Sequence, residues 1–391
     1  MYTRIKNIFK TLQYITLGLV IMLCVSPMVF GQVQQAASVI HDLHIIKSQV
    51  LNEERTILVR VPGNYTKSNE KFPVVYMLDA HTPYNSMMAG MMEQQAWSSQ
   101  MPEMILVGIQ NTNRVRDFTP TKTERLNSGG SDKFLEFIEK EVITFVEENY
   151  RTQPYRIFAG HSLGGLLVFY TFISQPNMFN AYIAASPVLH WDKDFVIKRA
   201  EEVFKQKKEY KKTLFFAIGD EPDYVNSFNS LKNLLKKTAP KNLEYGFNQM
   251  IEETHGSVVL PAYYQGLRKV FSGWLPQSEN ISDLESHYKK LSERFGYQIN
   301  IPENSLNQIG YQFLDLKKIE EAIEVFKKNS QLYPNSANVY HSLAEAFEKN
   351  GQLKQAKENY EKAYKMAEAQ ANLQLAKIAK DSYQRVSAKL K

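Results

Sequence analysis

The stretch RIFAGHSLGGLLVFYTFI, residues 156–173, decides the fold of this chain. It opens with a short apolar run, 156–159, of the kind that forms a buried strand. It closes with 163–173, where apolar residues recur at helical spacing. Between them lie glycines two residues before and two residues after Ser162. A turn this sharp needs glycine at both positions to avoid clashes, because a glycine has no Cβ. The stretch therefore predicts a strand, a tight turn and a helix in direct succession.

Residues 38–276 repeat this alternation of strand and helix signals. Further strand signals fall at 45–51, 56–61, 74–78, 104–109, 181–185, 214–218 and 243–251, and further helical patterns at 134–150, 225–237 and 259–274. Such alternation predicts a mostly parallel sheet with helices on both faces, an α/β fold. The first two strands are separated only by polar residues 52–54, which predicts an antiparallel hairpin at the sheet edge.

The Gly-x-Ser-x-Gly pattern on a strand–turn–helix is typical of the elbow that exposes a nucleophilic serine, and the arrangement resembles the α/β-hydrolase fold. A serine hydroxyl is a weak nucleophile, so Ser162 needs a histidine base and an orienting carboxylate, in the chain order Ser, acid, His. His255, in a loop between a strand signal and a helix signal, is the predicted base. His190 comes too early for that order. His287 and His341 fall in the helical tail and are interpreted as exposed helix-face residues.

The acid is expected just beyond the strand at 214–218, where the loop reads GDEPD, residues 219–223. Glu221 and Asp223 lie furthest from the strand end, and Asp223 can equally cap the next helix. The oxyanion of the reaction needs main-chain N–H donors. The predicted donors are Leu163, which follows the nucleophile, and His81, in the loop after the third strand.

Several segments together carry a family resemblance: 48–55, 73–79, 113–120, the turn at Ser162, and 254–257. Residues 40–275 are similar to the Putative esterase family, which groups esterase D, the mycolyltransferases, feruloyl and acetyl-xylan esterases and the trilactone siderophore esterases. The resemblance implies a serine carboxylic-ester hydrolase with an acyl-enzyme intermediate. The branch with the enterobactin and bacillibactin esterases looks nearest, and its Glu-Pro-like pair after the seventh strand favours Glu221 over Asp223. Ala80 and His81 depart from the family, whose members often carry glycine and an apolar residue there.

The substrate is expected to be a small-molecule ester, and a siderophore lactone and a carbohydrate or phenolic ester are both open. Loops that can border the site hold Arg114, Arg116 and Arg125, together with Asp117 and Tyr84. The paired arginines can bind a carboxylate or a catecholate–iron complex, or the loop can instead be structural and salt-bridged. Aromatic residues that can line an acyl pocket, or that can instead pack in the core, are Trp97, Trp191 and Tyr224. Two other functions are weighed against ester hydrolysis: a serine peptidase on the same fold, and a non-catalytic adaptor.

Residues 281–391 are rich in Lys, Glu and Ala and repeat with a period of 34 residues. The matching pairs are Gly310 with Ala344, Phe313 with Phe347, Ala322 with Ala356, and Phe326 with Tyr360. Small and aromatic residues at this period resemble the tetratricopeptide repeat. Two units, 303–336 and 337–370, are predicted, with helices at 283–295 and 371–390 as caps. The repeats are expected to bind a protein partner or a second copy of the chain.

Residues 1–31 have the layout of a secretory signal peptide, with Arg4, Lys6 and Lys10 before the apolar run 14–25. Cleavage is expected after Gly31, which predicts an exported protein, periplasmic or secreted, without a membrane span once the leader is removed. A retained anchor is the alternative, although the run is shorter than the roughly 20 residues of a span. Cys24 follows the bulky Leu23, which disfavours a lipid-attachment signal.

Composition narrows the function further. Cys24 is the only cysteine, so the mature chain can form neither a disulfide nor a thiolate metal site. The histidines lack the spacings of zinc motifs, and no metal or cofactor is expected. The formal net charge is +6, and three of the positive residues belong to the leader. A nucleic-acid partner is therefore not expected.

Overall fold

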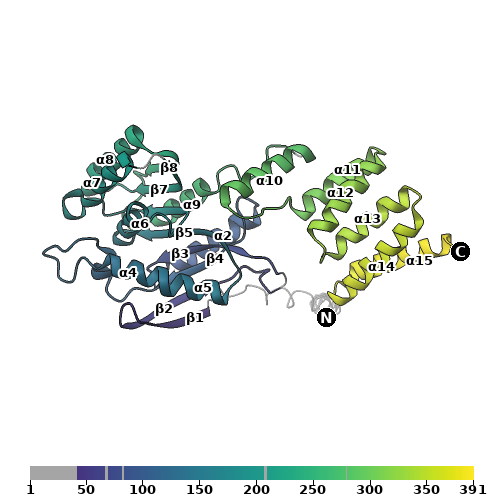
Figure 1. The fold of residues 1–391 in the computed structure, drawn as a ribbon, viewed down its shortest axis with the longest axis horizontal. Helices are drawn as coiled ribbons and strands as arrows, with labels where there is room; N and C mark the ends of the chain where they lie inside the picture. Colours follow the sequence, from purple (N-terminus) through teal and green to yellow (C-terminus); the bar gives the residue numbers. More distant parts are fainter. Residues whose placement is uncertain (1–41, 67–68, 82, 207–208, 279) are drawn as a thin grey trace, which may run out of the picture.

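The computed structural model describes residues 42–66, 69–81, 83–206, 209–278 and 280–391, so the predicted leader and its cleavage site lie outside the described residues. A single eight-stranded sheet occupies the first part of this described chain, in the order β1-β2-β4-β3-β5-β6-β7-β8 (Figure 1). The strands are β1 (Asp42–Ser48), β2 (Glu53–Arg60), β3 (Phe72–Leu78), β4 (Ile105–Ile109), β5 (Thr152–His161), β6 (Ala181–Ala185), β7 (Glu209–Ile218) and β8 (Lys241–Gln249).

The strand pairing confirms the predicted architecture. β1 and β2 form an antiparallel hairpin at one edge, and β2 also pairs antiparallel with β4. From β4 through β8 every pairing is parallel. The carboxyl ends of these parallel strands therefore meet at one edge of the sheet, which is where ligands bind in folds of this kind.

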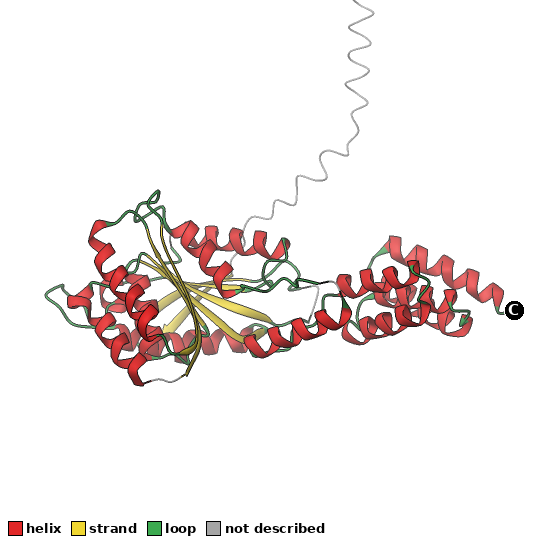
Figure 2. Ribbon diagram, turned by 90° about the horizontal axis from the view of Figure 1, so that it is seen from above, coloured by secondary structure: helices red, strands yellow, loops and turns green. Residues whose placement is uncertain are grey.

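Side chains alternate between the two faces of the sheet, and each face is covered by helices (Figure 2). In β3, Val74 and Tyr76 belong to one buried cluster and Val75 and Met77 to the other. The first face packs against α3 (Arg114–Phe118), α4 (Ser131–Phe137), η2 (Ile138–Ile143), α5 (Thr144–Asn149), α6 (Leu163–Ser174), α7 (Trp191–Gln206) and α8 (Pro222–Thr238). The second face packs against α2 (Tyr84–Trp97), α9 (Val259–Val270) and α10 (Ile281–Phe295).

Two long helices, α2 and α7, were not among the predicted elements. α2 is rich in Met and Gln and lacks a wide apolar stripe, with Met88 and Met92 as its main core contacts. α7 opens with three residues of positive φ, Asp192, Lys193 and Asp194, before it becomes regular. The single helix predicted at 134–150 is instead α4 and α5 joined by the π-helical turn η2.

The C-terminal part consists of paired helices, as the 34-residue period predicts (Figure 1). They are α11 (Glu303–Asp315), α12 (Ile319–Leu332), α13 (Ala337–Lys349), α14 (Leu353–Ala369) and α15 (Leu373–Lys389). Where α11 meets α12, a Cβ on Gly310 would lie 2.4 Å from the Phe326 ring, so the small residue is required there. His341 of α13 is predicted to be exposed but is only 9% exposed, because its ring packs against Tyr360 of α14.

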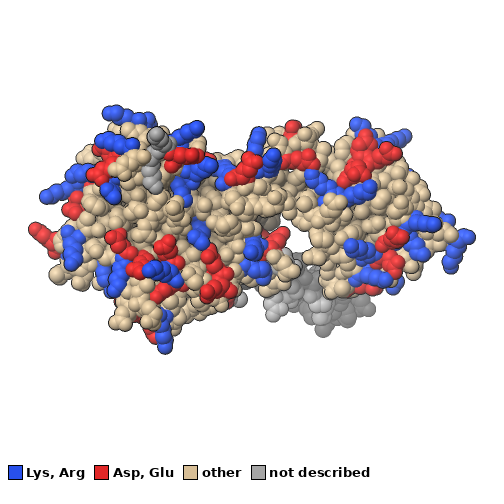
Figure 3. Space-filling view, in the orientation of Figure 1, with Lys and Arg blue, Asp and Glu red and all other residues tan. Residues whose placement is uncertain are grey.

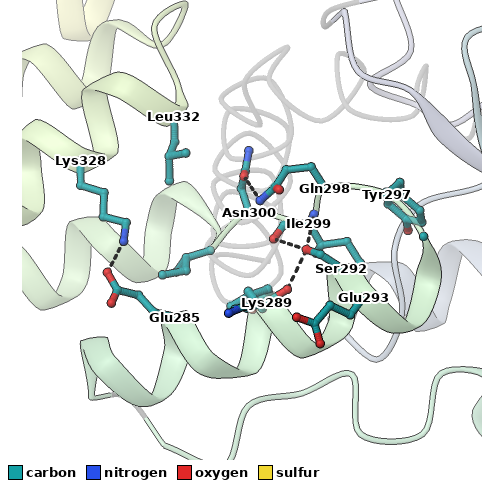
Figure 4. Close-up of a pocket in the computed structure, with 13 residues that line it drawn as sticks. Glu285, Lys289, Ser292, Glu293, Tyr297, Gln298, Ile299, Asn300, Lys328 and Leu332 are labelled. Atoms are coloured by element: carbon teal, nitrogen blue, oxygen red, sulfur yellow. Dashed lines mark hydrogen bonds and ion pairs between the residues drawn. The ribbon is translucent and has the colours of Figure 1, made fainter.

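Helix α10 attaches this tail to the sheet domain. Phe295 packs against Tyr155, Phe271 and Trp274, with ring centroids 4.8, 5.4 and 5.5 Å away. Leu306 and Ile309 of α11 belong to the same buried cluster. A hollow of about 570 Å³ lies between α10, α12 and the segment that follows α10 (Figure 4). Lys328 is paired with Glu285 at its rim. No helix within the described ranges is long and apolar enough to cross a membrane. Basic and acidic side chains are interspersed over the face of the molecule seen in Figure 3.

Candidate active site

Ser162 sits in the turn between β5 and α6 with φ +60° and ψ −117°. Such a backbone conformation is rarely adopted by residues other than glycine and costs about 1–3 kcal/mol, so the surrounding structure must hold it in place. The Ser162 N–H donates to the carbonyl of Ala185 at 2.9 Å, and its own carbonyl accepts from Leu166 N at 2.9 Å. The predicted strand–turn–helix is therefore present, with the serine at the carboxyl edge of the sheet.

The two glycines that flank the serine are not equally constrained. A Cβ on Gly160 would lie 2.5 Å from the carbonyl oxygen of Gly164, a distance that backbone atoms cannot relieve cheaply. At Gly164 a Cβ would meet the nearest atoms at 3.4 Å, which is ordinary contact. The expectation that both positions need glycine thus holds for Gly160 and is too strict for Gly164.

His255 and Glu221 are brought together by the loops after β8 and β7. His255 Nδ1 is hydrogen-bonded to Glu221 Oε1. The second carboxylate oxygen, Oε2, accepts from the Ser186 hydroxyl and from Gly219 N at 2.8 Å. Burial by itself would raise the pKa of Glu221, but the hydrogen bonds from His255, Ser186 and Gly219 lower it below its ordinary value. The buried carboxylate is thus charged at neutral pH, and the His255 tautomer with hydrogen on Nδ1 is favoured.

Asp223, the alternative acid, is exposed and lies in the first turn of α8. The residue that precedes the helix is Glu221, so the interpretation of Asp223 as an N-cap is wrong. The structure brings Glu221, and not Asp223, to His255.

Tyr224 stands beside both Ser162 and His255. Its ring centroid is 5.2 Å from that of His255 and 4.9 Å from that of His190. Burial and the Glu221 charge raise the pKa of the Tyr224 phenol, against a hydrogen bond with Ser162 that lowers it. Tyr224 is therefore a protonated phenol facing the Ser162 hydroxyl.

The two predicted oxyanion donors lie on neighbouring segments. Leu163 is the first residue of α6, so its N–H has no acceptor within the helix and lies at the positive end of the helix dipole. The loop after β3 begins with Asp79 at φ +59°. The N–H of the next residue, Ala80, donates to the carbonyl of Ile109 at 3.2 Å. His81 follows and is exposed.

A chain of hydrogen bonds runs behind these residues. Both oxygens of Asp79 accept from Arg114, each at 2.9 Å. Arg114 Nη2 also donates to the carbonyl of His161 at 2.8 Å. His161 Nε2 in turn lies 2.8 Å from the carbonyl oxygen of His255. Arg114 thus belongs to the framework of the site. Tyr84 is close to this chain, with its ring 5.6 Å from that of His161.

The other two loop arginines are paired elsewhere or exposed. Arg116 pairs with Glu53 at 2.6 Å and with Asp117 at 2.7 Å. Asp117 further binds the fully buried Arg55 at 2.6 Å. These contacts agree with the structural alternative for this loop. Arg125 is exposed.

Of the aromatic candidates, only Tyr224 lies against the serine. Trp191 is buried and donates through Nε1 to Thr121 at 3.0 Å. Trp97 is 86% exposed at the end of α2, where it lines a separate hollow with Arg60 and Glu93. Two contacts of the site, those of Ser186 and of the His161 side chain, escaped sequence reasoning because a lone serine or histidine at those positions carries no motif. Within the described residues, no group of three or more His, Cys, Asp or Glu side chains gathers as a metal-ion cluster.

Comparison with known proteins places this chain in a family. The profile of the family described as "Putative esterase" matches residues 48–257, more than half of the chain. The chain belongs to this family. A tetratricopeptide-repeat profile matches residues 303–369, in agreement with the predicted repeats.

Curated proteins similar to the chain include two siderophore esterases. The ferri-bacillibactin esterase BesA of Bacillus subtilis is 34% identical over an alignment of 177 residues, and the match covers 38% of this chain and 60% of the relative. The siderophore triacetylfusarinine C esterase of Aspergillus fumigatus is 28% identical over an alignment of 148 residues, and the match covers 35% of this chain and 51% of the relative. The chain thus spans little more than half the length of these relatives.

Solved structures resemble the chain over a greater length. An IroE-like serine hydrolase from Shewanella oneidensis matches 75% of this chain and 100% of its own, with 29% identity and a TM-score of 0.66. An uncharacterised protein from Capnocytophaga ochracea matches 89% of this chain and 100% of its own, with 18% identity and a TM-score of 0.64. At that identity the second likeness concerns the fold alone.

Proposed function

We propose that the chain is a serine carboxylic-ester hydrolase with Ser162 as nucleophile, His255 as base and Glu221 as the orienting acid. The observation that carries the proposal is the contact of His255 Nδ1 with a buried, hydrogen-bonded Glu221 at the carboxyl edge that also holds the strained Ser162. Family membership supports the same chemistry.

In the proposed reaction, Ser162 Oγ attacks the ester carbonyl while His255 Nε2 takes the serine proton. Glu221 stabilises the imidazolium that forms. The N–H groups of Leu163 and His81 bind the oxyanion. His255 then returns the proton to the departing alcohol, which leaves an acyl group on Ser162. A water molecule, deprotonated by His255, releases the acid and restores the serine.

For the substrate we favour an ester or lactone bond of a siderophore, because both curated relatives above are named for such compounds. Phenolic and carbohydrate esters are the competing class. The repeats are proposed to bind a protein partner or a second copy of the chain, and the leader to direct export with cleavage after Gly31.

The test begins with short-chain p-nitrophenyl esters and four proteins: the mature chain, Ser162→Ala, His255→Ala, and Ser174→Ala as a matched control on an exposed serine of α6. The first two variants are expected to lose about 10³-fold or more in kcat, and the control to keep wild-type rates. Equal rates in all four proteins would refute the proposal and favour a non-catalytic adaptor.

A second experiment addresses the substrate. Values of kcat/KM are compared for ferric siderophore trilactones, feruloylated and acetylated saccharides and a peptide amide. A preference for the saccharides would overturn the choice of a siderophore.

A further inference from the structure

The side chain of His161 joins the serine turn to the loop that carries His255. His161 Nε2 lies 2.8 Å from the His255 carbonyl oxygen, and the two rings are 4.6 Å apart with an interplanar angle of 45°. A carbonyl group can only accept a hydrogen bond, so Nε2 carries the hydrogen and donates it. The residue before the proposed nucleophile thus holds the main chain of the proposed base.

His161 is suited to stand next to a group that becomes charged. The residue is 8% exposed. Burial, then the nearby His255 and Arg114, lower the pKa of His161 to about 4. It is therefore neutral at pH 7 and donates through Nε2 alone. When His255 takes the serine proton, the new cation faces a neutral ring and meets no like charge there.

The main chain of His161 is itself held firmly. Its carbonyl accepts from Arg114 at 2.8 Å, and Arg114 is fixed by both oxygens of Asp79. The His161 ring also packs edge-on with the ring of Tyr84. His161 is thereby anchored to the sheet edge by groups that do not belong to the His255 loop, so it can act as a fixed point for that loop.

The His255 loop has a second tie, to a different segment. The N–H of Asp220 donates to the carbonyl of Glu253 at 2.6 Å. A Cβ on Gly219 would lie 2.3 Å from the same carbonyl oxygen, so the two loops touch directly. This tie sets the base loop against the acid loop, whereas the His161 bond sets it against the nucleophile. Without the His161 side chain, the distance between His255 and Ser162 should therefore become variable. The contact of His255 with Glu221 should persist.

We infer that His161 is a positioning residue that holds the His255 loop at the distance from Ser162 required for proton transfer. The inference rests on the proposed function, since it assigns His161 a role in that reaction, and it predicts a defect in kcat rather than in KM.

Four variants test it. His161→Leu fills the site without a donor, and His161→Asn carries an amide too short to reach the carbonyl. His161→Gln places an amide nitrogen near the Nε2 position and retains the bond. His287→Leu is the matched control, because His287 Nε2 makes the same kind of bond, 2.9 Å from the carbonyl oxygen of Trp274, away from Ser162.

The expected result is a fall in kcat of about 10- to 100-fold for the Leu and Asn variants, with KM within about threefold, and recovery to within a few-fold in the Gln variant. His287→Leu should keep the wild-type kcat. Wild-type kcat in the Leu and Asn variants, or a Gln variant as impaired as they are, would overturn the inference.

Hydrogen exchange of residues 250–258 gives a readout that does not need turnover. Exchange should accelerate in the Leu and Asn variants and stay at the wild-type rate in the Gln variant and the control. Absence of esterase activity in the wild-type protein would refute the proposed function and with it the role in proton transfer. If the wild-type protein is active and exchange is unchanged in the Leu and Asn variants, only the positioning role of His161 is refuted.

Discussion

At the scale of single residues, one carboxylate of three in the loop after β7 has the contacts of a triad acid. Glu221 is buried and its two oxygens face His255, Ser186 and Gly219, whereas Asp223 points from an exposed helix turn. Removing the charge of Glu221 leaves a neutral amide that cannot stabilise the imidazolium of His255. The sequence of this loop alone does not distinguish Glu221 from Asp223, because the choice depends on the residue at which α8 begins.

We expect Glu221→Gln to lower kcat about 10³-fold and Asp223→Asn to change it less than about threefold. The pair is measured with one activated ester at a fixed pH, after circular dichroism has shown equal folding. A larger loss in Asp223→Asn than in Glu221→Gln would reverse the assignment.

The neutral His161 predicts a specific pH dependence of stability. Its pKa is lowered by burial to about 4, against about 6.5 in an unfolded chain. The unfolded state thus binds more protons between these values, and stability falls as the pH drops from about 6.5 to about 4. Relative to His161→Gln, the free energy of unfolding of the wild-type chain should fall by at most about 3 kcal/mol over this pH window and should not change above it. Urea unfolding at about pH 7, 5.5 and 4.5 measures the difference; parallel curves for the two proteins would contradict it.

At the scale of elements, the sequence predicted what periodicity and motif encode. The elbow, the edge hairpin and the repeats follow from patterns within short windows. α2 was missed because its core contacts are methionines spread among polar residues, a pattern without a clear helical stripe. The helical period does not say which neighbour covers a face, so the sequence wrongly predicts that His341 is exposed. In the fold, Tyr360 of α14 covers it.

The contact of α11 with α12 depends on the missing side chain of Gly310. Gly310→Ala would place a Cβ 2.4 Å from Phe326, and the strain should lower the free energy of unfolding of the repeats by about 1–3 kcal/mol. Gly90→Ala is the control in α2, where nothing lies within 4 Å of the new Cβ and the gain in helix propensity should stabilise by about 0.5–1 kcal/mol. Thermal unfolding followed by circular dichroism should give opposite signs. A stabilising Gly310→Ala would mean that the two helices are not packed as closely as described.

At the scale of the whole molecule, the repeats and the candidate active site lie at opposite ends of the parallel strands. Ser162 follows the carboxyl end of β5, whereas a hollow next to the helical tail is lined by Phe72 and Gln153, at the amino ends of β3 and β5. The tail therefore does not cover the serine. A partner bound by the repeats would be held at the far edge, so we expect the repeats to place the enzyme rather than to gate it.

Because α10 shares its core with the sheet domain, a change in that helix should destabilise the sheet domain. Trp97, Trp191 and Trp274 all precede α10 in the chain, so their fluorescence follows the sheet domain, and Trp274 also senses α10 through its contact with Phe295. Phe295→Ala removes a ring that is 2% exposed and should lower the free energy of unfolding seen by fluorescence by about 3–5 kcal/mol. The control Phe347→Ala, within the repeats, should shift the loss of helix seen by circular dichroism and leave the fluorescence midpoint nearly unchanged. In both variants kcat of the folded protein should stay near wild type, because neither ring reaches the carboxyl edge. If Phe295→Ala leaves the fluorescence transition unmoved, α10 unfolds with the repeats, and the sheet domain ends before Ile281.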